Sequence, residues 1–359
     1  MFAELTETMI IAEIGVNHDG SLNKAKELIS AARDCGASAV KFQSFKVESL
    51  VGENSPTPEY QLKQVQNSQY EILKKVEFSF SQQEELFAHA ENIGIEIFAT
   101  PFDLDSLSFL VNEMMVRVIK VSSGDIDNSP LLYSIGKTSL PTILSTGASE
   151  LKDIDYALAV LNLGRQRESV PRDINTAINF SFDESSMGKM DCLLHCTSQY
   201  PAPFEDINLY SIPYLSKKYQ IPIGLSDHSL GIDACVAAVA LGAVVLEKHL
   251  TLNRFDKGPD HLASLDPVSF AQLVSSVRNV ERAKGQASKC VMNSELQNRA
   301  LIRRSVYAAR DIEAGAIIEA SDLVMLRPQV GNSHPHEYWE LIGSTAARDF
   351  HKGENVRVS

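Results

Sequence analysis

The sequence lacks the features that mark secreted, membrane-spanning and nucleic-acid-binding proteins. No run approaches the roughly 20 apolar residues that a membrane-spanning helix needs. The N-terminal segment has no basic stretch followed by a long apolar core, so we do not expect secretion. Positive charge is also scarce: 33 lysines and arginines stand against 46 aspartates and glutamates, a net charge of −13. This balance argues against nucleic-acid binding and leaves an anionic substrate to be held by a few local lysines.

Cysteine usage indicates a reducing compartment. The five cysteines are odd in number, lie mostly in apolar stretches and form no CxxC pair. We therefore predict reduced cysteines in the core of a cytoplasmic protein. The remaining composition is that of an ordinary globular chain, with 44% hydrophobic and 22% charged residues. Its 359 residues are enough for one barrel of about 250–300 residues and a small second domain.

Short apolar stretches alternate with segments of helical periodicity over most of the chain. We predict strands at residues 9–14, 39–43, 95–99, 116–121, 141–144, 192–196, 221–225 and 244–246. Continuous apolar runs of this length are typical of parallel strands that are buried on both faces. Eight strands in alternation with helices predict an α/β fold, the (β/α)8 or TIM barrel, whose catalytic groups lie at the C-terminal ends of the strands.

Two segments interrupt this alternation. Residues 46–76 are too long and too polar for a plain connection, and we expect them to cross the mouth of the barrel. Residues 164–190 form a polar insertion between a helix and a strand, which places them on the face opposite the site. Before the third strand, Ser81 and Glu84 have the spacing of a capping box, which predicts that a helix begins there.

The last part of the chain differs in pattern from the rest. We assign residues 1–285 to the barrel, 286–299 to a polar linker and 300–359 to a small β-rich domain, with short strands at 305–309 and 323–326. A module of this size has little core of its own, so docking onto another surface would stabilise it.

Polar side chains follow or end most of the predicted strands. They are Glu13, Lys41, Gln43, Lys120, Ser122, Ser123, Asp125, Ser145, Ser198, Tyr200, Ser226, His228 and His249. Two lysines among several hydroxyls suit a phosphate and a carboxylate. His228 and His249, at the ends of neighbouring strands, suit a divalent metal with open coordination positions.

The same residues could instead have purely structural roles. A histidine after a strand can be a hydrogen-bonded structural residue, and the two lysines can form salt bridges with Glu13 or Asp125. The serines can cap the helices that follow them. We expect Asp227 and Glu247 to support the site or the fold.

Short motifs at these strand ends occur in a defined order. They are AEIGVNHDG (12–20), VKFQ (40–43), FATPFD (98–103), KVSSGD (120–125), ILSTG (143–147), LLHCTSQYPAP (193–203), GLSDHS (224–229), EKHLT (247–251) and GPDHLASL (258–265). In this order they resemble the sialic acid synthase (N-acetylneuraminate synthase) family. SVYAARDIEAG (305–315) and DLVMLRP (322–328) resemble that family's C-terminal SAF (antifreeze-like, β-clip) domain. The resemblance spans nearly the whole chain.

The resemblance implies a transferase that condenses phosphoenolpyruvate with the open-chain aldehyde of N-acetylmannosamine or a related 2-acetamido sugar, releasing phosphate with C–O cleavage. It implies that His228 and His249 hold Mn²⁺, or another divalent metal such as Mg²⁺, which activates the aldehyde. The residues that would bind phosphoenolpyruvate are Lys41, Gln43, Lys120, Ser123, Ser145 and Ser226. The residues that would contact the sugar or move protons are Glu13, Asp125, Ser198, Tyr200 and Asp260.

The resemblance also implies a homodimer in which the SAF domain is swapped over the partner's barrel. Arg327 would then reach the sugar in the partner's site. This arrangement agrees with a C-terminal domain that is too small to be stable alone. On these grounds we expect a cytoplasmic enzyme of surface polysaccharide biosynthesis.

Two alternative functions remain open. A legionaminate or pseudaminate synthase would use a diacetamido-trideoxy hexose instead, and the sugar stays open because positions 125 and 198 vary within the family. A non-catalytic sugar-binding or ice-binding module is suggested by the C-terminal resemblance alone. Two lysines and two histidines at one barrel rim argue against such a module.

Overall fold

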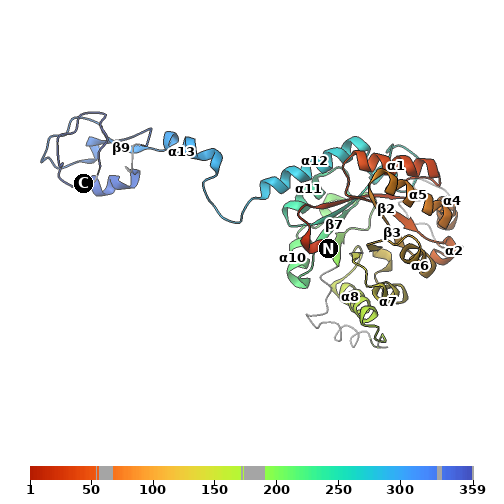
Figure 1. Cartoon of the computed structure of the whole chain (residues 1–359). Coiled ribbons are helices and arrows are strands. Elements are labelled where there is room, and N and C mark those ends of the chain that lie inside the picture. Colours follow the sequence, from red (N-terminus) through yellow and green to blue (C-terminus); the bar gives the residue numbers. More distant parts are fainter. Residues whose placement is uncertain (54, 56–67, 171–172, 174–190, 330–333, 358–359) are drawn as a thin grey trace. The chain divides into compact units, whose positions relative to one another are not determined.

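The structure, a computed structural model, describes residues 1–53, 55, 68–170, 173, 191–329 and 334–357. The chain divides into two units, Met1–Gly285 and Gln286–Ser359, both drawn in Figure 1. Most of the polar insertion, and the middle of the segment expected at the barrel mouth, lie outside the described residues. Each unit has a hydrophobic core of its own.

Eight parallel strands form the barrel of the first unit. They are β1 (Met9–Gly15), β2 (Ala39–Ser44), β3 (Glu96–Pro101), β4 (Ile119–Val121), β5 (Thr142–Ser145), β6 (Cys192–Cys196), β7 (Ile223–Asp227) and β8 (Val245–His249). Their order is β3-β2-β1-β8-β7-β6-β5-β4, so the first strand pairs with both the second and the last. Because β3 and β4 also lie in contact, the sheet is a nearly closed barrel, which confirms the predicted fold.

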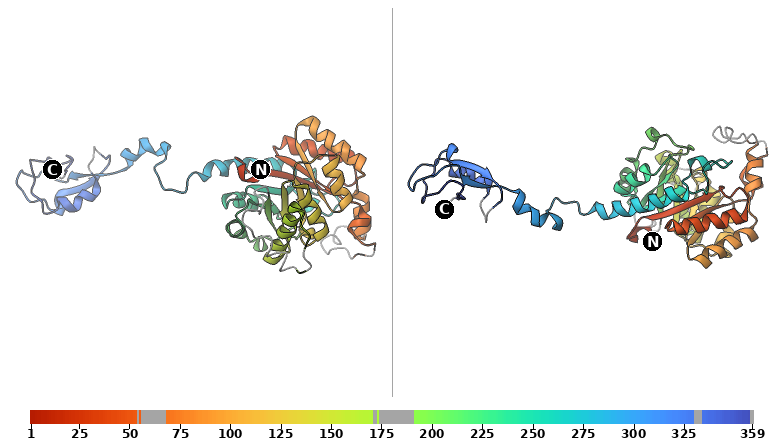
Figure 2. Two further views of the ribbon diagram at one scale, coloured as in Figure 1. Left: turned by 60° about the horizontal axis from the view of Figure 1, so that its bottom comes forward. Right: turned by 90° about the horizontal axis from the view of Figure 1, so that it is seen from above.

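A helix follows each strand, and these helices cover the outside of the barrel (Figure 2). They are α1 (Leu22–Asp34), α5 (Phe80–Ile93), α6 (Leu104–Asn112), α7 (Ser129–Thr138), α8 (Leu151–Gln166), α10 (Ser211–Tyr219), α11 (Asp233–Ala240) and α12 (Pro267–Lys284). Two further helices, α2 (Val47–Leu50) and α4 (Gln69–Val76), belong to the long segment between β2 and α5. Among the described residues, no helix combines the length and the apolar character that crossing a lipid bilayer requires.

The apolar stretches become strands because both of their faces are buried. In β1, Ile10, Ile11, Ala12 and Ile14 are all inaccessible to water, so one set of side chains faces the barrel interior and the other faces the helices. The charged residue of this strand, Glu13, comes near its C-terminal end. The strand interiors therefore form the core, and the strand ends carry polar groups.

The helix before β3 begins earlier than predicted. Ser79, rather than Ser81, accepts a hydrogen bond from the backbone N–H of Gln82, whose side chain accepts in turn from the N–H of Ser79. The capping box predicted at Ser81 is therefore wrong. Ser79 and Ser81 both precede a Gln or Glu by three residues, which is the spacing that a capping box requires. The earlier start brings Phe80 into α5, where its ring stacks on that of Phe109 at a centroid distance of 4.3 Å.

The strands β7 and β8 extend beyond their predicted ends. Asp227 and Lys248 are register partners, and their side chains form an ion pair at 2.7 Å. Polar residues can continue a buried ladder when they neutralise each other in this way. As a result, His249 is the last residue of β8, and His228 directly follows β7.

A small apolar cluster lies apart from the barrel core, at the C-terminal ends of the strands. Its members are Val16, Phe45 and Val76, with Leu50, Leu73 and Phe102 packed against them. Three of these residues directly follow β1, β2 and β3, and the others come from α2 and α4. The described part of the segment between β2 and α5 thus lies at the barrel mouth, as predicted.

The second unit contains a two-stranded antiparallel sheet. Strand β9 (Ser305–Ala308) pairs with β10 (Leu323–Leu326), and a short helix, α14 (Tyr338–Leu341), follows. The core of this unit consists of Val306, Ala308, Ile312, Ile318, Leu323, Leu341, Ala346, Phe350 and Val356. Helix α13 (Leu296–Ile302) begins within the segment that we expected to be a linker. The small β-rich domain is confirmed.

His18, in the loop after β1, is buried and neutral. Its ring stacks on Phe78 at a centroid distance of 4.2 Å, and its Nδ1 accepts a hydrogen bond from the backbone N–H of Gly20 at 3.1 Å. Burial lowers the pKa of His18 to about 4, although the neighbouring Asp19 acts in the opposite direction. The folded barrel therefore keeps this ring unprotonated at pH values where an exposed histidine is charged.

We predict that protonation of His18 in the unfolded chain destabilises the barrel in mild acid. Because the folded pKa is about 4 and the ordinary value is 6.5, stability is lost as the pH falls through this interval. Between about pH 7 and about pH 5, the free energy of unfolding should fall by about 2 kcal/mol more in the wild type than in His18→Gln, which keeps an acceptor for Gly20. Urea titrations of both proteins measure this, and parallel losses would contradict it.

Candidate active site

A cavity of about 210 Å³ opens among the C-terminal ends of the strands. It is lined by Glu13, Lys41, Gln43, Thr100, Phe102, Lys120, Ser122, Ser123, Gly124, Ser145, Cys196, Ser198, Tyr200, Ser226, His228, Glu247 and His249. Asp260 lines an adjoining chamber. Asp125 lies outside both linings, since its carboxylate accepts hydrogen bonds from Ser122 and Asn128 in the turn after β4. Arg327, the remaining predicted site residue, is exposed in the second unit.

Two lysines and two glutamates form a buried cluster of charge in this cavity. Lys41 Nζ lies 2.7 Å from Glu13 Oε2 and donates a hydrogen bond to Thr100 Oγ1 at 3.1 Å. Glu247 lies between the lysines, with Oε2 3.8 Å from Lys41 Nζ and Oε1 3.7 Å from Lys120 Nζ. All four charged side chains are almost fully removed from water. The salt bridge that we considered between Lys41 and Glu13 is therefore present.

Hydroxyl groups surround the second lysine. Lys120 Nζ donates to Ser145 Oγ at 2.7 Å, and Ser226 Oγ donates at 3.0 Å to the carboxylate between the lysines. Nearby, Ser123 Oγ accepts a hydrogen bond from the backbone N–H of Gly147 at 2.9 Å. Ammonium and hydroxyl donors gathered in this way suit a ligand with several anionic oxygens.

Burial shifts the protonation equilibria of this cluster. It raises the pKa of Glu13 to about 7, against the opposing charge of Lys41, and Glu247 adds to the rise. It also lowers the pKa of Lys120, against the attraction of Glu247. Buried charges are stable only when opposite charges are well placed. An anionic ligand would give both lysines closer partners than Glu247, whose oxygens lie 3.7 and 3.8 Å away.

His228 and His249 stand next to this cluster, with their ring centroids 5.5 Å apart. His228 Nδ1 lies 2.8 Å from the carbonyl oxygen of Thr197, which can only accept, so Nδ1 carries a proton and the neutral ring would offer Nε2 as a ligand atom. His249 Nδ1 has no hydrogen-bond partner among the described residues and lies 3.8 Å from Asp260 Oδ2. Burial lowers the pKa of His249 well below its ordinary value, so this ring is neutral.

This donor set fits a divalent metal ion. Neutral imidazole nitrogens and carboxylate oxygens are common ligands of first-row divalent metals. The lone pair of His228 is fixed in direction by Thr197, and His249 offers a buried nitrogen beside the carboxylate of Asp260. A purely structural role would leave that buried nitrogen of His249 unsatisfied, which is costly.

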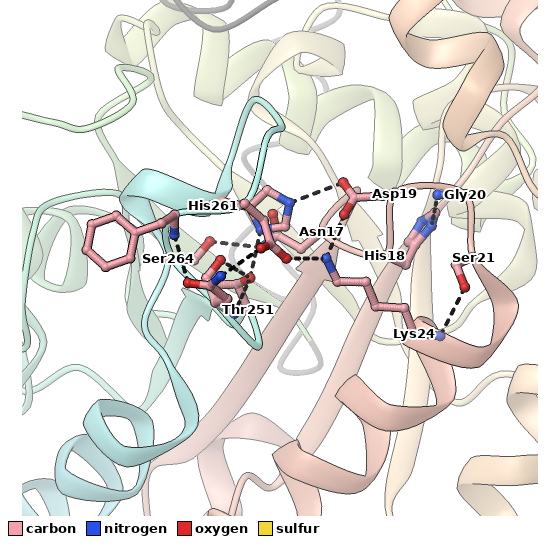
Figure 3. A network of polar contacts seen from close by, with 12 residues as sticks. Asn17, His18, Asp19, Gly20, Ser21, Lys24, Thr251, His261 and Ser264 are labelled. Atoms are coloured by element: carbon pink, nitrogen blue, oxygen red, sulfur yellow. Dashed lines mark hydrogen bonds and ion pairs between the residues drawn. The ribbon is translucent and has the colours of Figure 1, made fainter.

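Hydrogen bonds fix the loop that carries Asp260 (Figure 3). On one side, His261 Nε2 lies 3.1 Å from Asp19 Oδ1. On the other side, Asn17 Nδ2 donates to Ser264 Oγ at 2.8 Å, and Ser264 Oγ donates to the carbonyl oxygen of Asp260 at 2.6 Å. The loop after β1 and the loop after β8 are thus tied together on both sides of Asp260.

The same network contains a second group of potential metal ligands. Asp19, Asp256 and His261 bring three ligand atoms within 4.8 Å of one another. However, Lys24 Nζ lies 2.6 Å from a carboxylate oxygen of Asp19 and 2.6 Å from one of Asp256. An ammonium group therefore already neutralises these carboxylates, and the donor set of the paired histidines fits a metal better.

Glu247, Thr100 and Cys196 line the cavity, although the sequence pattern did not assign them to it. For Glu247 the signal was present, because residues two apart in a strand point to the same side, and Glu247 precedes His249 by two. For Thr100 there was no such signal. Its place beside Gln43 follows from the pairing of β2 with β3, which the sequence does not display.

A fully buried ion pair holds together the two strands that carry the histidines. Lys248 Nζ lies 2.7 Å from Asp227 Oδ2 and donates a hydrogen bond to the carbonyl oxygen of Ser229 at 2.6 Å. Neither member of the pair lines the cavity, whereas the adjacent His228 and His249 do. This alternation is the one expected for successive residues of a strand.

Comparison with known proteins decides the family. Residues 28–289 match the NeuB family, and residues 303–357 match the SAF domain. The chain belongs to the NeuB family. It is a nonulosonic acid synthase-type enzyme, and the resemblance drawn from the sequence motifs is confirmed. NeuB-family enzymes use phosphoenolpyruvate and acetamido sugars, and they typically use a divalent metal.

Relatives of this NeuB-family chain are named for different sugar acids. The N,N'-diacetyllegionaminic acid synthase of Campylobacter jejuni is 39% identical over 356 residues, covering 98% of this chain and 100% of that protein. The protein of the same name in Legionella pneumophila is 40% identical over 349 residues, covering 97% and 92%. The solved N-acetylneuraminic acid (sialic acid) synthetase of Leptospira borgpetersenii is 32% identical with a TM-score of 0.68, covering 82% and 90%.

Breaking the buried ion pair of this NeuB-family enzyme should cost far more stability than breaking a surface pair. Asp227→Asn leaves the ammonium of Lys248 buried without its counter-charge, and we expect the free energy of unfolding to fall by about 3–5 kcal/mol. The control is Asp105→Asn, because Asp105 pairs with Lys46 at an exposed position and the expected loss is about 0–1 kcal/mol. Chemical unfolding followed by circular dichroism measures both, and similar losses would contradict the prediction.

Proposed function

We propose that this enzyme condenses phosphoenolpyruvate with the open-chain aldehyde of a diacetamido-trideoxy hexose, releasing phosphate and forming a product of the legionaminic acid type. The observation that carries the proposal is a pair of buried lysines among hydroxyl groups, beside an imidazole pair, within one cavity. The reaction needs both, because one substrate is an anion and the other is an aldehyde that must become more electrophilic.

The choice of sugar depends on the relatives. The sequence motifs alone led us to expect N-acetylmannosamine or a related sugar first, with the diacetamido-trideoxy hexose as the alternative. Two relatives named for N,N'-diacetyllegionaminic acid are 39% and 40% identical over nearly the whole chain, whereas the N-acetylneuraminate-9-phosphate synthase of Homo sapiens is 37% identical over 93% of it and the solved sialic acid synthetase is 32% identical. This difference supports the alternative, and N-acetylmannosamine becomes the competing substrate.

The lysine cluster would bind phosphoenolpyruvate. Lys41 and Lys120 supply positive charge at positions almost fully removed from water, where an ion pair with phosphate or carboxylate is strong. The neutral donors around them are Gln43, Ser123, Ser145 and Ser226. Holding both anionic groups would orient the enol carbon toward the aldehyde, which removes much of the entropic barrier to their reaction.

The histidine pair would hold Mn²⁺ or another divalent ion such as Mg²⁺. When bound, the ion supplies Lewis acidity at the aldehyde oxygen. The chain itself fixes His228 through Thr197 and places Asp260 next to His249. Ser198 and Tyr200, which line the same cavity, would position the sugar.

The bond changes need groups that hold protons near neutral pH. C3 of phosphoenolpyruvate bonds to the aldehyde carbon, and the aldehyde oxygen takes up a proton to become a hydroxyl. Water then adds at C2 and loses a proton, and the tetrahedral intermediate releases phosphate by cleavage of its C–O bond. Burial raises the pKa of Glu13 to about 7 and that of Asp260 to about 6, so each can carry or release a proton at this site.

Phosphate release tests the proposed function. Full-length protein with phosphoenolpyruvate and Mn²⁺ should release phosphate when an acetamido sugar of this class is added, and should stop after chelation of the metal. His228→Ala and His249→Ala should each lose Mn²⁺ binding in calorimetry as well as turnover, because each removes a ligand. His351→Ala, at a position 83% exposed in the second unit, is the control. The absence of phosphate release with every acetamido sugar would contradict the proposal.

We also propose a homodimer in which the SAF domain lies over the partner's barrel and Arg327 reaches the partner's sugar. Arg327 directly follows β10 and is exposed. The SAF core is small, and Ile317 and Trp339 remain 65% and 77% exposed on this unit. A second surface that covered these side chains would stabilise a module with so little core.

Mixed dimers test the role of Arg327. Arg327→Ala and His249→Ala proteins should each be inactive alone, because each lacks a group that every site needs. When they are co-folded, one of the two sites in a mixed dimer combines an intact barrel with an intact arginine, so partial activity should return. Activity of isolated heterodimers is the measurement, and no recovery in confirmed heterodimers would place Arg327 in its own chain's site.

A further inference from the structure

A chamber of about 330 Å³ adjoins the catalytic cavity and has a different lining. The two spaces share Gln43, Phe102, Gly124, Tyr200 and His249. The rest of the chamber wall is mainly aliphatic and includes Val16, Leu50, Val51, Ile72, Leu73 and Val76. A sugar whose aldehyde lies at His249 would therefore place its remaining carbons in an apolar space.

One face of α4 supplies much of this wall. Gln69, Ile72, Leu73 and Val76 follow the spacing i, i+3, i+4 and i+7, and all four line the chamber. Residues with this spacing lie on one side of a helix. Ser68 begins the helix with a capping box, which fixes where its first turn starts. The face presents an amide at its N-terminal end and three aliphatic side chains after it.

These aliphatic side chains are separate from the core that holds the barrel together. Val76 and Leu73 belong to the apolar cluster at the barrel mouth, not to the barrel core. Ile72 and Val76 line the chamber and are otherwise buried, with 7% and 8% of their surface exposed. Apolar side chains around a concave space typically bind the apolar parts of a ligand.

Apart from Gln69 on α4, the polar side chains of the chamber lie near the catalytic cavity. Gln43 and His249 line both spaces, and Asp260 lies next to His249. A sugar hydroxyl directed at the aliphatic wall would lose its water without gaining a hydrogen-bond partner, which weakens binding. A methyl group or an unsubstituted carbon in the same place would bind more tightly because it leaves water.

We propose that the face of α4 formed by Ile72, Leu73 and Val76 determines sugar specificity by selecting a hexose that carries a second acetamido methyl group and a deoxy carbon at the end away from the aldehyde. The inference rests on the proposed function and names the part of the chain that chooses between the two candidate sugars. The strand ends supply the chemistry that both sugars share.

Specificity is the ratio of kcat/KM for the diacetamido-trideoxy hexose to kcat/KM for N-acetylmannosamine. The wild-type ratio should exceed about ten. Val76→Thr and Leu73→Asn keep the side-chain shapes but introduce polar atoms, so each should lower the ratio about five- to tenfold, mainly through weaker use of the diacetamido sugar. Val268→Thr, at a position of α12 that is 80% exposed, should leave the ratio unchanged.

The outcomes separate this inference from the function on which it rests. Release of phosphate with neither sugar overturns the proposed function. Turnover of both sugars with a ratio near one, or a ratio that Val76→Thr and Leu73→Asn leave unchanged, overturns the role of α4 alone. The KM for phosphoenolpyruvate should stay within about twofold of the wild type. Variants that lose phosphoenolpyruvate binding would show that the wall supports the fold, which also counts against a role in specificity.

Discussion

The burial of four charges at one end of the barrel constrains the structure around them. Glu13, Lys41, Lys120 and Glu247 come from β1, β2, β4 and β8, and almost no water reaches them. Such charges persist only when opposite charges lie a few ångströms away, so these strands must meet in one register. A barrel of parallel strands provides this geometry because all C-terminal ends lie on one rim. The apolar strand interiors below that rim offset the cost of burying the charges.

Two charged clusters near the rim, one around Lys24 and one around Glu247, show how a structural network differs from a ligand-binding site. Lys24 lies 2.6 Å from the carboxylates of both Asp19 and Asp256, so that network is satisfied within the protein. Glu247 lies between two lysines but stays 3.7 and 3.8 Å from their ammonium groups. Lys41 and Lys120 have closer partners in Glu13 and Ser145, so an anionic ligand can displace the looser contacts with Glu247 while each lysine keeps one partner in the protein.

Much of the barrel and most of the lining of the cavity could be predicted from the sequence, because a period of two assigns each strand residue to one side. Features that depend on contacts between helices and strands could not be predicted in this way. The ends of β7 and β8 depend on the pairing of Asp227 with Lys248, which is visible only once the strands are adjacent. The carboxylate of Asp125 accepts hydrogen bonds within its own turn instead of lining the cavity. The wall formed by α4 depends on where that helix lies over the mouth, which no local pattern encodes.

The catalytic groups lie on the strands, whereas the apolar wall lies on α4 in the segment between β2 and α5. This separation explains how one reaction can serve several sugars. The charged cluster and the paired histidines are fixed by the register of the strands, so a change there disturbs binding and reaction together. Helix α4 lies in a connection outside the sheet, and its side chains reach the substrate through the apolar chamber. Substitutions on this face can change the polarity of the wall while leaving the buried charges in place. Relatives named for legionaminic and for sialic acids fit this arrangement, because they share the fold with this chain and differ in the sugar acid that they are named for.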